Sequence, residues 1–181
     1  MLVRSTKIGT KKPSGITKPD FIALDIQDID FELLATYGIK ACFIDLDGTV
    51  VDKGTYNVSE GIIKTLRGTK MKIYIATNRP KSRDLKNLRE LLNASGVIHP
   101  HKFWGKPFKR YFENGLKDIN LQRHEVVMIG DRYVQDIIGA NRAGIYSLLV
   151  KKLDKPKGFL DEMISKAERK YTDKISVDYL K

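Results

Sequence analysis

Hydrophobic and polar residues follow two alternating periods along this chain, one typical of strands and one typical of helices. Short apolar runs that end in turn residues predict buried strands, and apolar residues three and four apart predict amphipathic helices. The predicted strands are 39–46, 71–77, 125–131 and 145–150, with a shorter extended piece within 97–104. The predicted helices are one capped by Asp28 or Asp30 that ends at Gly38, one capped by Ser59 that covers 61–67, and those at 82–95, 108–117, 135–142 and 158–170. This order predicts an α/β, Rossmann-like three-layer sandwich with a mostly parallel sheet.

The same pattern divides the chain into a core and two less regular ends. Residues 1–18 carry basic side chains among Gly, Pro, Ser and Thr, so we expect a flexible basic N-terminal arm. Residues 19–153 hold most of the predicted elements and form the core domain, and 154–181 add a C-terminal helix and tail. The segments between successive strands have room only for turns and single helices. We therefore expect no large cap domain.

Composition and charge narrow the classes of function. The chain has 181 residues, of which 41% are hydrophobic, enough for one domain with a real core. No apolar run reaches the roughly 20 residues of a transmembrane helix, and the first residues lack the apolar core of a signal peptide, so we expect a cytoplasmic protein. There are 33 basic and 22 acidic residues, a net charge of +11. Such a surface attracts phosphorylated substrates, nucleic acid or anionic lipid, although it is also compatible with simple solvation.

Functional groups stand where the predicted strands end. Asp45 and Asp47 close the first strand, Thr77 the second and Asp131 a later one, while Lys106 heads a helix after the extended piece. Because the carboxyl ends of parallel strands share one edge of a sheet, these groups should converge. Each of them alone has a structural explanation, such as a turn, an N-cap or a surface position. Together, and in this order, they are the inventory that phosphoryl transfer needs.

Four aspartates, the three at these strand ends and Asp136 one helical turn after Asp131, divide the chemistry among them. Asp45 is predicted to attack phosphorus, to form an aspartyl-phosphate and to ligate Mg²⁺ with its other oxygen. Asp47 points the same way along an extended backbone and would protonate the leaving oxygen and then activate water. Asp131 would complete the Mg²⁺ shell, and Asp136 would hold the metal directly or through water. The predicted metal ligands are therefore Asp45, Asp47, Asp131 and Asp136.

The remaining groups act on the phosphoryl oxygens. Thr77 would donate a hydrogen bond to them, and Lys106 would neutralise charge between them and Asp45. Backbone N–H groups at the Gly48 turn would add donors for the anion. Arg79 places a positive charge near the site, where it either contacts substrate or lies on the surface. The predicted catalytic residues are Asp45, Asp47, Thr77 and Lys106.

Four segments of the chain resemble the motifs of a known superfamily. These segments are Asp45-Leu46-Asp47-Gly48-Thr49, Ile75-Ala76-Thr77-Asn78, Gly105-Lys106-Pro107, and Gly130-Asp131 with Asp136. They are similar to the motifs of the haloacid dehalogenase-like (HAD) phosphatases, and the wider pattern over residues 19–153 resembles the type IIIA subgroup. That subgroup holds the YqeG-like proteins, which are related to phosphatidylglycerophosphate phosphatases. Asp47 resembles the phosphatases and phosphomutases, because the dehalogenases and transport ATPases of the superfamily lack it.

The resemblance implies a HAD-type fold and a Mg²⁺-dependent phosphomonoester hydrolase. With no large cap domain, the expected substrate is phosphatidylglycerophosphate or another large or surface-bound phosphate, and the protein would contact an anionic membrane peripherally at its inner face. The predicted substrate-binding residues are Gly48, Asn78 and Arg79. Phe103 and Trp104 precede Lys106, and we expect them to pack in the core rather than on substrate. The alternative hypothesis is a basic, non-catalytic RNA- or ribosome-binding module on the same fold.

Overall fold

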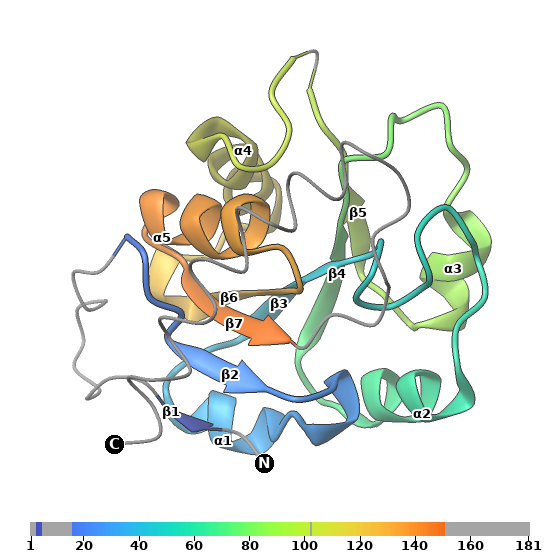
Figure 1. The fold of residues 1–181 in the computed structure, drawn as a ribbon, viewed down its shortest axis with the longest axis horizontal. Coiled ribbons are helices and arrows are strands. Elements are labelled where there is room, and N and C mark those ends of the chain that lie inside the picture. Colours follow the sequence, from blue (N-terminus) through green and yellow to red (C-terminus); the bar gives the residue numbers. More distant parts are fainter. Residues whose placement is uncertain (1–2, 5–15, 102, 151–181) are drawn as a thin grey trace.

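The computed structural model describes residues 3–4, 16–101 and 103–150. In this part of the chain seven strands form one sheet, in the order β1-β2-β7-β6-β3-β4-β5 (Figure 1). Its strands are β1 (Val3–Arg4), β2 (Phe21–Ala23), β3 (Ala41–Asp45), β4 (Lys72–Ala76), β5 (Gly96–Ile98), β6 (Val126–Gly130) and β7 (Tyr146–Val150). Neighbouring strands are parallel except the short edge strand β1, which is antiparallel to β2. The predicted mostly parallel sheet is confirmed.

Helices cover both faces of this sheet. The α-helices are α1 (Phe31–Thr36), α2 (Glu60–Gly68), α3 (Lys86–Leu91), α4 (Lys109–Ile119) and α5 (Gly139–Ala143). Two 3₁₀ turns, η1 (Ile26–Asp28) and η2 (Arg123–Glu125), and a π-helix, η3 (Tyr133–Ile138), complete the set in the described residues. Within these residues no helix is long and apolar enough to span a bilayer, and no separate cap domain is present.

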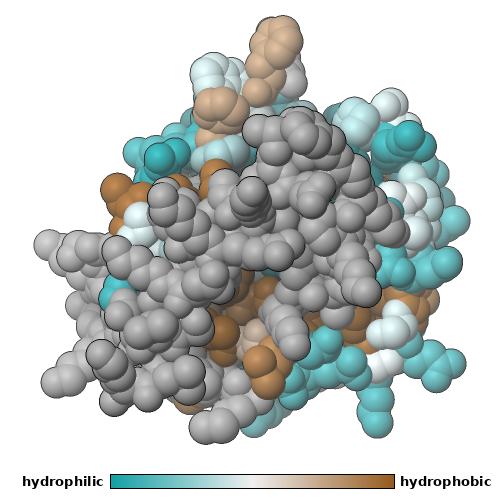
Figure 2. All heavy atoms as spheres, in the orientation of Figure 1, coloured by the Kyte–Doolittle hydropathy of each residue, from teal (hydrophilic) through white to brown (hydrophobic). Residues whose placement is uncertain are grey.

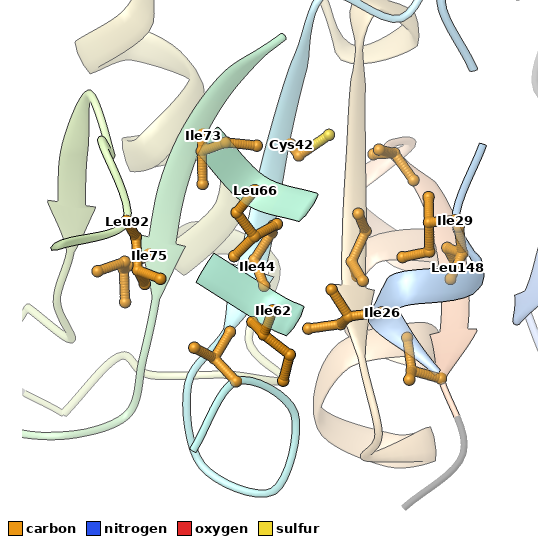
Figure 3. Packing of buried hydrophobic residues seen from close by; sticks show 14 of the residues in the cluster. Ile26, Ile29, Cys42, Ile44, Ile62, Leu66, Ile73, Ile75, Leu92 and Leu148 are labelled. Carbon is orange, nitrogen blue, oxygen red and sulfur yellow. The ribbon is translucent and has the colours of Figure 1, made fainter. Parts of the chain in front are cut away.

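The alternation of side chains along β3 produces the three layers. Cys42 and Ile44 point into a cluster with apolar residues of α1, α2 and α3, including Leu66 (Figure 3). Ala41 and Phe43 point to the opposite face, where residues of α4 and α5 pack against them. Successive residues of a strand face opposite sides, so a strand buried on both sides is apolar throughout. The predicted three-layer α/β sandwich is confirmed.

The element boundaries follow local signals in most places. Ser59 caps α2 by accepting the N–H of Ile62, Asp30 caps α1 through the N–H of Leu33, and α1 is followed by Gly38, which has a φ of +79°. Of the helix predicted at 82–95, only the part that forms α3 is helical, so the observed helix is shorter than expected. The predicted N-terminal arm is described only at 3–4 and 16–18, and the segment 154–181 with its predicted helix lies outside the described residues.

The sheet order places three functional strand ends side by side. β3 is central, between β4 and β6. In the register of these pairs Asp45 lies opposite Ala76, and Ile44 lies opposite both Ile75 and Ile129. The residues that follow β4 and β6 therefore leave the sheet beside the end of β3. This adjacency is what a site shared among several loops requires.

The loop between β5 and α4 departs from expectation. Phe103 is 92% exposed, Trp104 38% and Phe108 50%, so the predicted core packing of Phe103 and Trp104 is wrong. Trp104 and Phe108 instead form an edge-to-face pair with ring centres 5.1 Å apart, and the guanidinium of Arg110 lies 5.8 Å from the centre of the Trp104 ring. In Figure 2 hydrophobic side chains project at the top of the molecule, where Figure 1 places this loop.

Candidate active site

Lys106 lies between two buried aspartates. Asp45 ends β3, Asp136 lies in η3, and Lys106 comes from the loop between β5 and α4. The Lys106 Nζ donates to Asp45 Oδ1 and, at 2.7 Å, to Asp136 Oδ1. The lysine side chain is only 1% exposed, so this ammonium belongs to the interior rather than to the basic surface. The structure thus brings together three of the predicted site residues from distant parts of the chain.

Three carboxylates of this cluster could hold a metal ion. Asp45, Asp131 and Asp136 each offer an oxygen atom, and these three oxygens lie within 4.8 Å of one another. All three residues are buried. Carboxylates this close repel each other unless a cation lies among them, and a set of oxygen donors alone is the set that hard divalent cations prefer. The residues therefore fit such a metal.

Burial and charge act on these groups in opposite directions. Burial raises the pKa of the Asp45 and Asp136 carboxyls above the ordinary range, although Lys106 opposes the rise. Burial alone would lower the pKa of Lys106, but the two carboxylates outweigh it, so the pKa of Lys106 is raised and the amine stays protonated. A cation among the carboxylates favours their charged forms. The charged form of Asp45 is the one that can act as a nucleophile.

Two glycines make room for the carboxylates. A Cβ atom at Gly130 would lie 2.2 Å from Asp136 Oδ2, and one at Gly48 would lie 2.8 Å from Asp131 Oδ2. Gly48 also has a φ of +86°, a conformation that other residues rarely adopt. Its N–H donates to the carbonyl of Val51 at 2.7 Å and is therefore not directed to an anion, unlike the predicted role. In this structure Gly48 contributes space and turn geometry.

Thr49 holds Asp131 in place, a role that the sequence did not indicate. Its hydroxyl is fully buried, accepts the backbone N–H of Asp131 at 3.0 Å and donates to Asp131 Oδ1 at 3.3 Å. The loop after β3 therefore sets the position of a carboxylate that follows β6. The position of Thr49 directly after the Asp-x-Asp-Gly turn was the available signal.

Asp47 does not join the metal cluster through its side chain. Its two oxygens accept from Arg79, Oδ2 from Nε at 2.9 Å and Oδ1 from Nη2 at 2.7 Å, and Oδ1 also accepts the N–H of Gly54 at 2.8 Å. Burial alone would raise the pKa of the Asp47 carboxyl, but the hydrogen bonds from Arg79 and Gly54 outweigh it and lower this pKa. Asp47, predicted as a metal ligand, is thus paired with the guanidinium of Arg79. That guanidinium lies over the ring of Tyr56, 4.8 Å from its centre.

The two residues that follow β4, Thr77 and Asn78, form hydrogen bonds with backbone groups of nearby loops. Thr77 is fully buried, and its hydroxyl oxygen accepts the N–H of Arg79 at 3.0 Å. This bond uses a lone pair and leaves the hydroxyl proton for donation. Asn78, predicted to bind substrate, instead forms two hydrogen bonds with the backbone of Lys106. Its Oδ1 accepts the Lys106 N–H at 2.7 Å, and its Nδ2 donates to the Lys106 carbonyl at 3.0 Å. Asn78 thereby sets the position from which Lys106 reaches Asp45.

A cavity of about 420 Å³ lies over the cluster and is lined by Asp45, Asp47, Asn78 and Arg79, among others. Its size is within the range of small-molecule sites. Asp136, below it, lies in a π-helix, an element that often occurs at functional sites. The Asp136 Oδ2 accepts the N–H of Arg132 at 3.0 Å, which orients the carboxylate toward Lys106.

Comparison with known proteins agrees with this arrangement. Residues 103–164 match the HAD-hydrolase-like family model. The probable phosphatase YqeG of Bacillus subtilis is 28% identical over 155 residues, which is 84% of this chain and 87% of that protein. A 47-residue segment is 49% identical to the phospholysine phosphohistidine inorganic pyrophosphate phosphatase of Danio rerio, covering 26% of this chain and 17% of that one.

A solved HAD-superfamily hydrolase of subfamily IA from Geobacter sulfurreducens has the same fold. It superimposes with a TM-score of 0.53 at 17% identity, over 65% of this chain and 92% of that one. At this identity the likeness concerns the fold alone. In its sequence matches, its fold and its buried carboxylate cluster the chain is similar to the HAD-like hydrolases, and over most of its length to the probable phosphatase YqeG.

Proposed function

We propose that the protein is a Mg²⁺-dependent phosphomonoester hydrolase that works through an aspartyl-phosphate on Asp45. The observation that supports this most directly is the buried contact of Lys106 with Asp45 and Asp136, with an oxygen of Asp131 within 4.8 Å of theirs. A structural salt bridge would need one carboxylate, whereas this cluster gathers three, two at the ends of β3 and β6 and one from η3. A module that only binds RNA would gain nothing from such a cluster.

The reaction proceeds in two displacements at phosphorus, with a phosphorylated Asp45 as the intermediate between them. A carboxylate oxygen of Asp45 attacks phosphorus, the bond from phosphorus to the alcohol oxygen breaks, and Asp47 gives that oxygen a proton. Asp47 then takes a proton from water, the water oxygen attacks phosphorus, and the bond to Asp45 breaks to release inorganic phosphate. Asp47 must leave Arg79 to do this, because in the paired state its pKa is lowered and it holds no proton to donate.

Other side chains stabilise the charge that develops on the phosphoryl oxygens. Lys106 contacts Asp45 directly and lies where it can neutralise that charge. Thr77 has its hydroxyl proton to donate. Asp45, Asp131 and Asp136 would hold Mg²⁺, which would supply further neutralisation when bound.

Activity on an aryl phosphate tests this proposal. Purified protein should hydrolyse para-nitrophenyl phosphate with Mg²⁺, lose turnover in EDTA, and regain it when Mg²⁺ is restored. The metal requirement follows from the repulsion among three buried carboxylates and an incoming phosphate. Turnover that persists in EDTA would contradict the metal dependence. Salt-sensitive RNA binding without any hydrolysis would favour the non-catalytic alternative.

The substrate proposed from the resemblance is phosphatidylglycerophosphate or another large or surface-bound phosphate. The exposed aromatic residues of the β5–α4 loop support contact with an anionic membrane. The same loop supplies Lys106, and basic side chains of the adjoining α4, such as Arg110, lie beside its aromatic rings. Aromatic rings beside basic side chains suit the interface of an anionic bilayer. Docking of this loop would bring the phosphoryl site to lipid head groups.

Loss of two of these rings should weaken membrane binding. Phe103→Ser combined with Phe108→Ser should reduce binding to vesicles that contain phosphatidylglycerol by about tenfold or more, because two rings no longer enter the interface. Co-sedimentation measures the effect. Leu24→Ser, which changes a side chain that is 63% exposed outside this loop, is the matched control. Equal losses in the two variants would remove the loop from the membrane contact.

A further inference from the structure

The carboxamide of Asn78 directs both of its N–H groups to the protein. Its Nδ2 donates to the carbonyl of Lys106 at 3.0 Å and to Oε1 of Gln135 at 3.4 Å, and its Oδ1 accepts the N–H of Lys106 at 2.7 Å. A side-chain amide has two donors and two acceptor lone pairs, so a single lone pair on Oδ1 remains. A phosphate oxygen needs a donor. Asn78 lines the cavity, but in this arrangement it has no N–H to offer a phosphoryl group.

The two bonds to Lys106 hold that residue by its backbone. One side chain pairs with both main-chain polar groups of Lys106, as two opposed residues of neighbouring strands pair with each other. Such a pair of bonds fixes the direction of a residue as well as its position. The lysine has a flexible four-carbon stem, and its ammonium contacts Asp45 and Asp136 in the interior. A shift of the backbone would therefore move the ammonium away from these carboxylates.

Gly105 allows the amide of Asn78 to approach this closely. A Cβ atom at Gly105 would lie 2.6 Å from Asn78 Oδ1, a distance that real Cβ atoms essentially never show. Any larger residue at 105 would displace the amide or the loop. The contact between Asn78 and residues 105–106 is therefore tight, and it depends on the absence of a side chain at this position.

Asn78 itself lies on a well-anchored part of the sheet. It directly follows Thr77, whose N–H donates to the carbonyl of Ile98 at the end of β5, at 3.2 Å. The buried hydroxyl of Tyr111, on α4, lies 3.1 Å from the carbonyl oxygen of Thr77 and 2.8 Å from that of Ile98. The loop that carries Lys106 begins after β5 and ends at α4. Asn78 thus ties the middle of this loop to the strand end that also anchors both of its ends.

We propose that Asn78 is a positioning residue of the reaction, which acts through Lys106 by fixing its backbone so that the ammonium stays beside Asp45, and which does not bind the substrate. This inference rests on the proposed function. A displacement of about 1 Å in a catalytic group can lower a rate about 100-fold. Loss of the positioning bonds should therefore lower kcat. Loss of a substrate contact that is equally strong before and during the reaction would instead raise KM and leave kcat unchanged.

Steady-state kinetics on Asn78→Leu separates the two roles. Leucine is close to asparagine in shape but forms neither bond to Lys106. With para-nitrophenyl phosphate at saturating Mg²⁺, kcat should fall about 10- to 100-fold while KM stays within about threefold. Asn87→Leu, the same change at an exposed asparagine of α3 outside the cavity lining, should leave both constants within about twofold. A raised KM with an unchanged kcat in Asn78→Leu overturns the proposal.

Gly105→Ala tests the same contact with Asn78 retained. The added Cβ displaces the amide, so kcat should again fall while KM changes little. Combining Gly105→Ala with Asn78→Leu should lower kcat no further than the more damaging of the two changes alone, because both remove the same bonds. Full activity of Gly105→Ala together with an intact fold overturns the proposal. Should Asn78→Leu fail to fold, Gly105→Ala takes its place in the measurements that follow.

A double-mutant cycle with Lys106 decides whether Asn78 acts through it. Lys106→Met protein has no ammonium to position, so the addition of Asn78→Leu should lower its residual kcat by less than about twofold. A further loss as large as the one that Asn78→Leu causes in the wild-type protein would mean that Asn78 acts on the substrate or on the fold directly. The proposal would then be wrong.

Denaturant unfolding in EDTA separates this proposal from the proposed function. Lys106→Met should reduce stability less in Asn78→Leu protein than in the wild-type protein, because an ammonium that is no longer held beside both carboxylates contributes less. If the wild-type protein hydrolyses no ester but this difference is present, the hydrolase proposal fails and the placement of Lys106 by Asn78 stands. If esters are hydrolysed and the two changes are additive in both kcat and stability, the positioning role alone fails.

Discussion

Replacing Asp45 by asparagine should lower turnover of para-nitrophenyl phosphate by about 10⁴-fold or more, because the step that depends on a nucleophile is lost. An amide oxygen has no negative charge with which to attack phosphorus, and it is a weaker ligand for a divalent cation. The shape of the side chain is retained, and Lys106 keeps its hydrogen bond to Asp136. The loss should therefore appear in kcat while the fold persists. Steady-state kinetics at saturating Mg²⁺ measures it.

Asp118→Asn is the matched control for this result. Asp118 is an exposed carboxylate of α4, and its replacement should leave turnover within twofold of the wild-type value. Thermal unfolding of both variants shows whether the fold is intact. Rapid quenching with phosphorus-labelled substrate should find label on the wild-type chain and none on the asparagine variant. Label that persists in Asp45→Asn would place the intermediate on another residue.

The strands and their ends were predictable because their signals are local. The apolar run before Asp45 contains β-branched and aromatic residues and stops at two aspartates, and β3 ends there as expected. β4 and β6 likewise end within one residue of Thr77 and Asp131. Their convergence then follows from parallel topology alone, without any knowledge of side-chain contacts. This explains why the buried carboxylate cluster could be anticipated from the sequence.

The hydrogen bonds that orient the site were not predictable, because they join residues far apart in the chain. Asn78 and Lys106 are 28 residues apart, Asp47 and Arg79 are 32 apart, and Thr49 and Asp131 are 82 apart. No periodicity encodes such pairs. The sequence therefore indicated which groups are present but assigned Asn78 to substrate and Asp47 to metal, whereas their side chains contact the protein itself.

The hydrophobic pattern also failed to predict where α3 begins and that β2 is a strand. The Asp84 side chain accepts the N–H of Lys86 at 2.8 Å, and this competing hydrogen bond delays the start of α3 from the expected Ser82. β2 has three residues, too few for a periodic signal. Asp20, which precedes it, bonds the N–H and hydroxyl of Ser147 across 127 residues and so aligns β2 with β7. A local hydrogen bond thus decides where α3 begins, and a tertiary contact decides where β2 forms.

Replacing Lys106 by methionine should destabilise the metal-free protein by about 3–5 kcal/mol, the cost of removing one partner from a buried ion pair. Methionine fills much of the volume but leaves the Asp45 and Asp136 carboxylates without their ammonium. Denaturant unfolding in EDTA measures the loss. A carboxyl whose pKa is raised in the folded state binds protons more readily there than in the unfolded chain, so the defect should shrink as the pH falls.

Mg²⁺ should restore most of that stability. A cation bound only by the folded state stabilises that state, and here it would neutralise the negative charge of the carboxylates in place of the lost ammonium. Turnover should remain about 10²–10³-fold low, since the ammonium beside the phosphoryl group is missing. Lys109→Met removes a half-exposed lysine that pairs with Glu113, and as the control it should change stability by less than about 0.5 kcal/mol. Should Lys106→Met fail to fold even with Mg²⁺, Lys106→Arg retains the charge and should unfold closer to wild type. Equal stability of Lys106→Met and Lys109→Met in EDTA would mean that the buried ammonium does not hold the carboxylates together, and the electrostatic account of the site would be wrong.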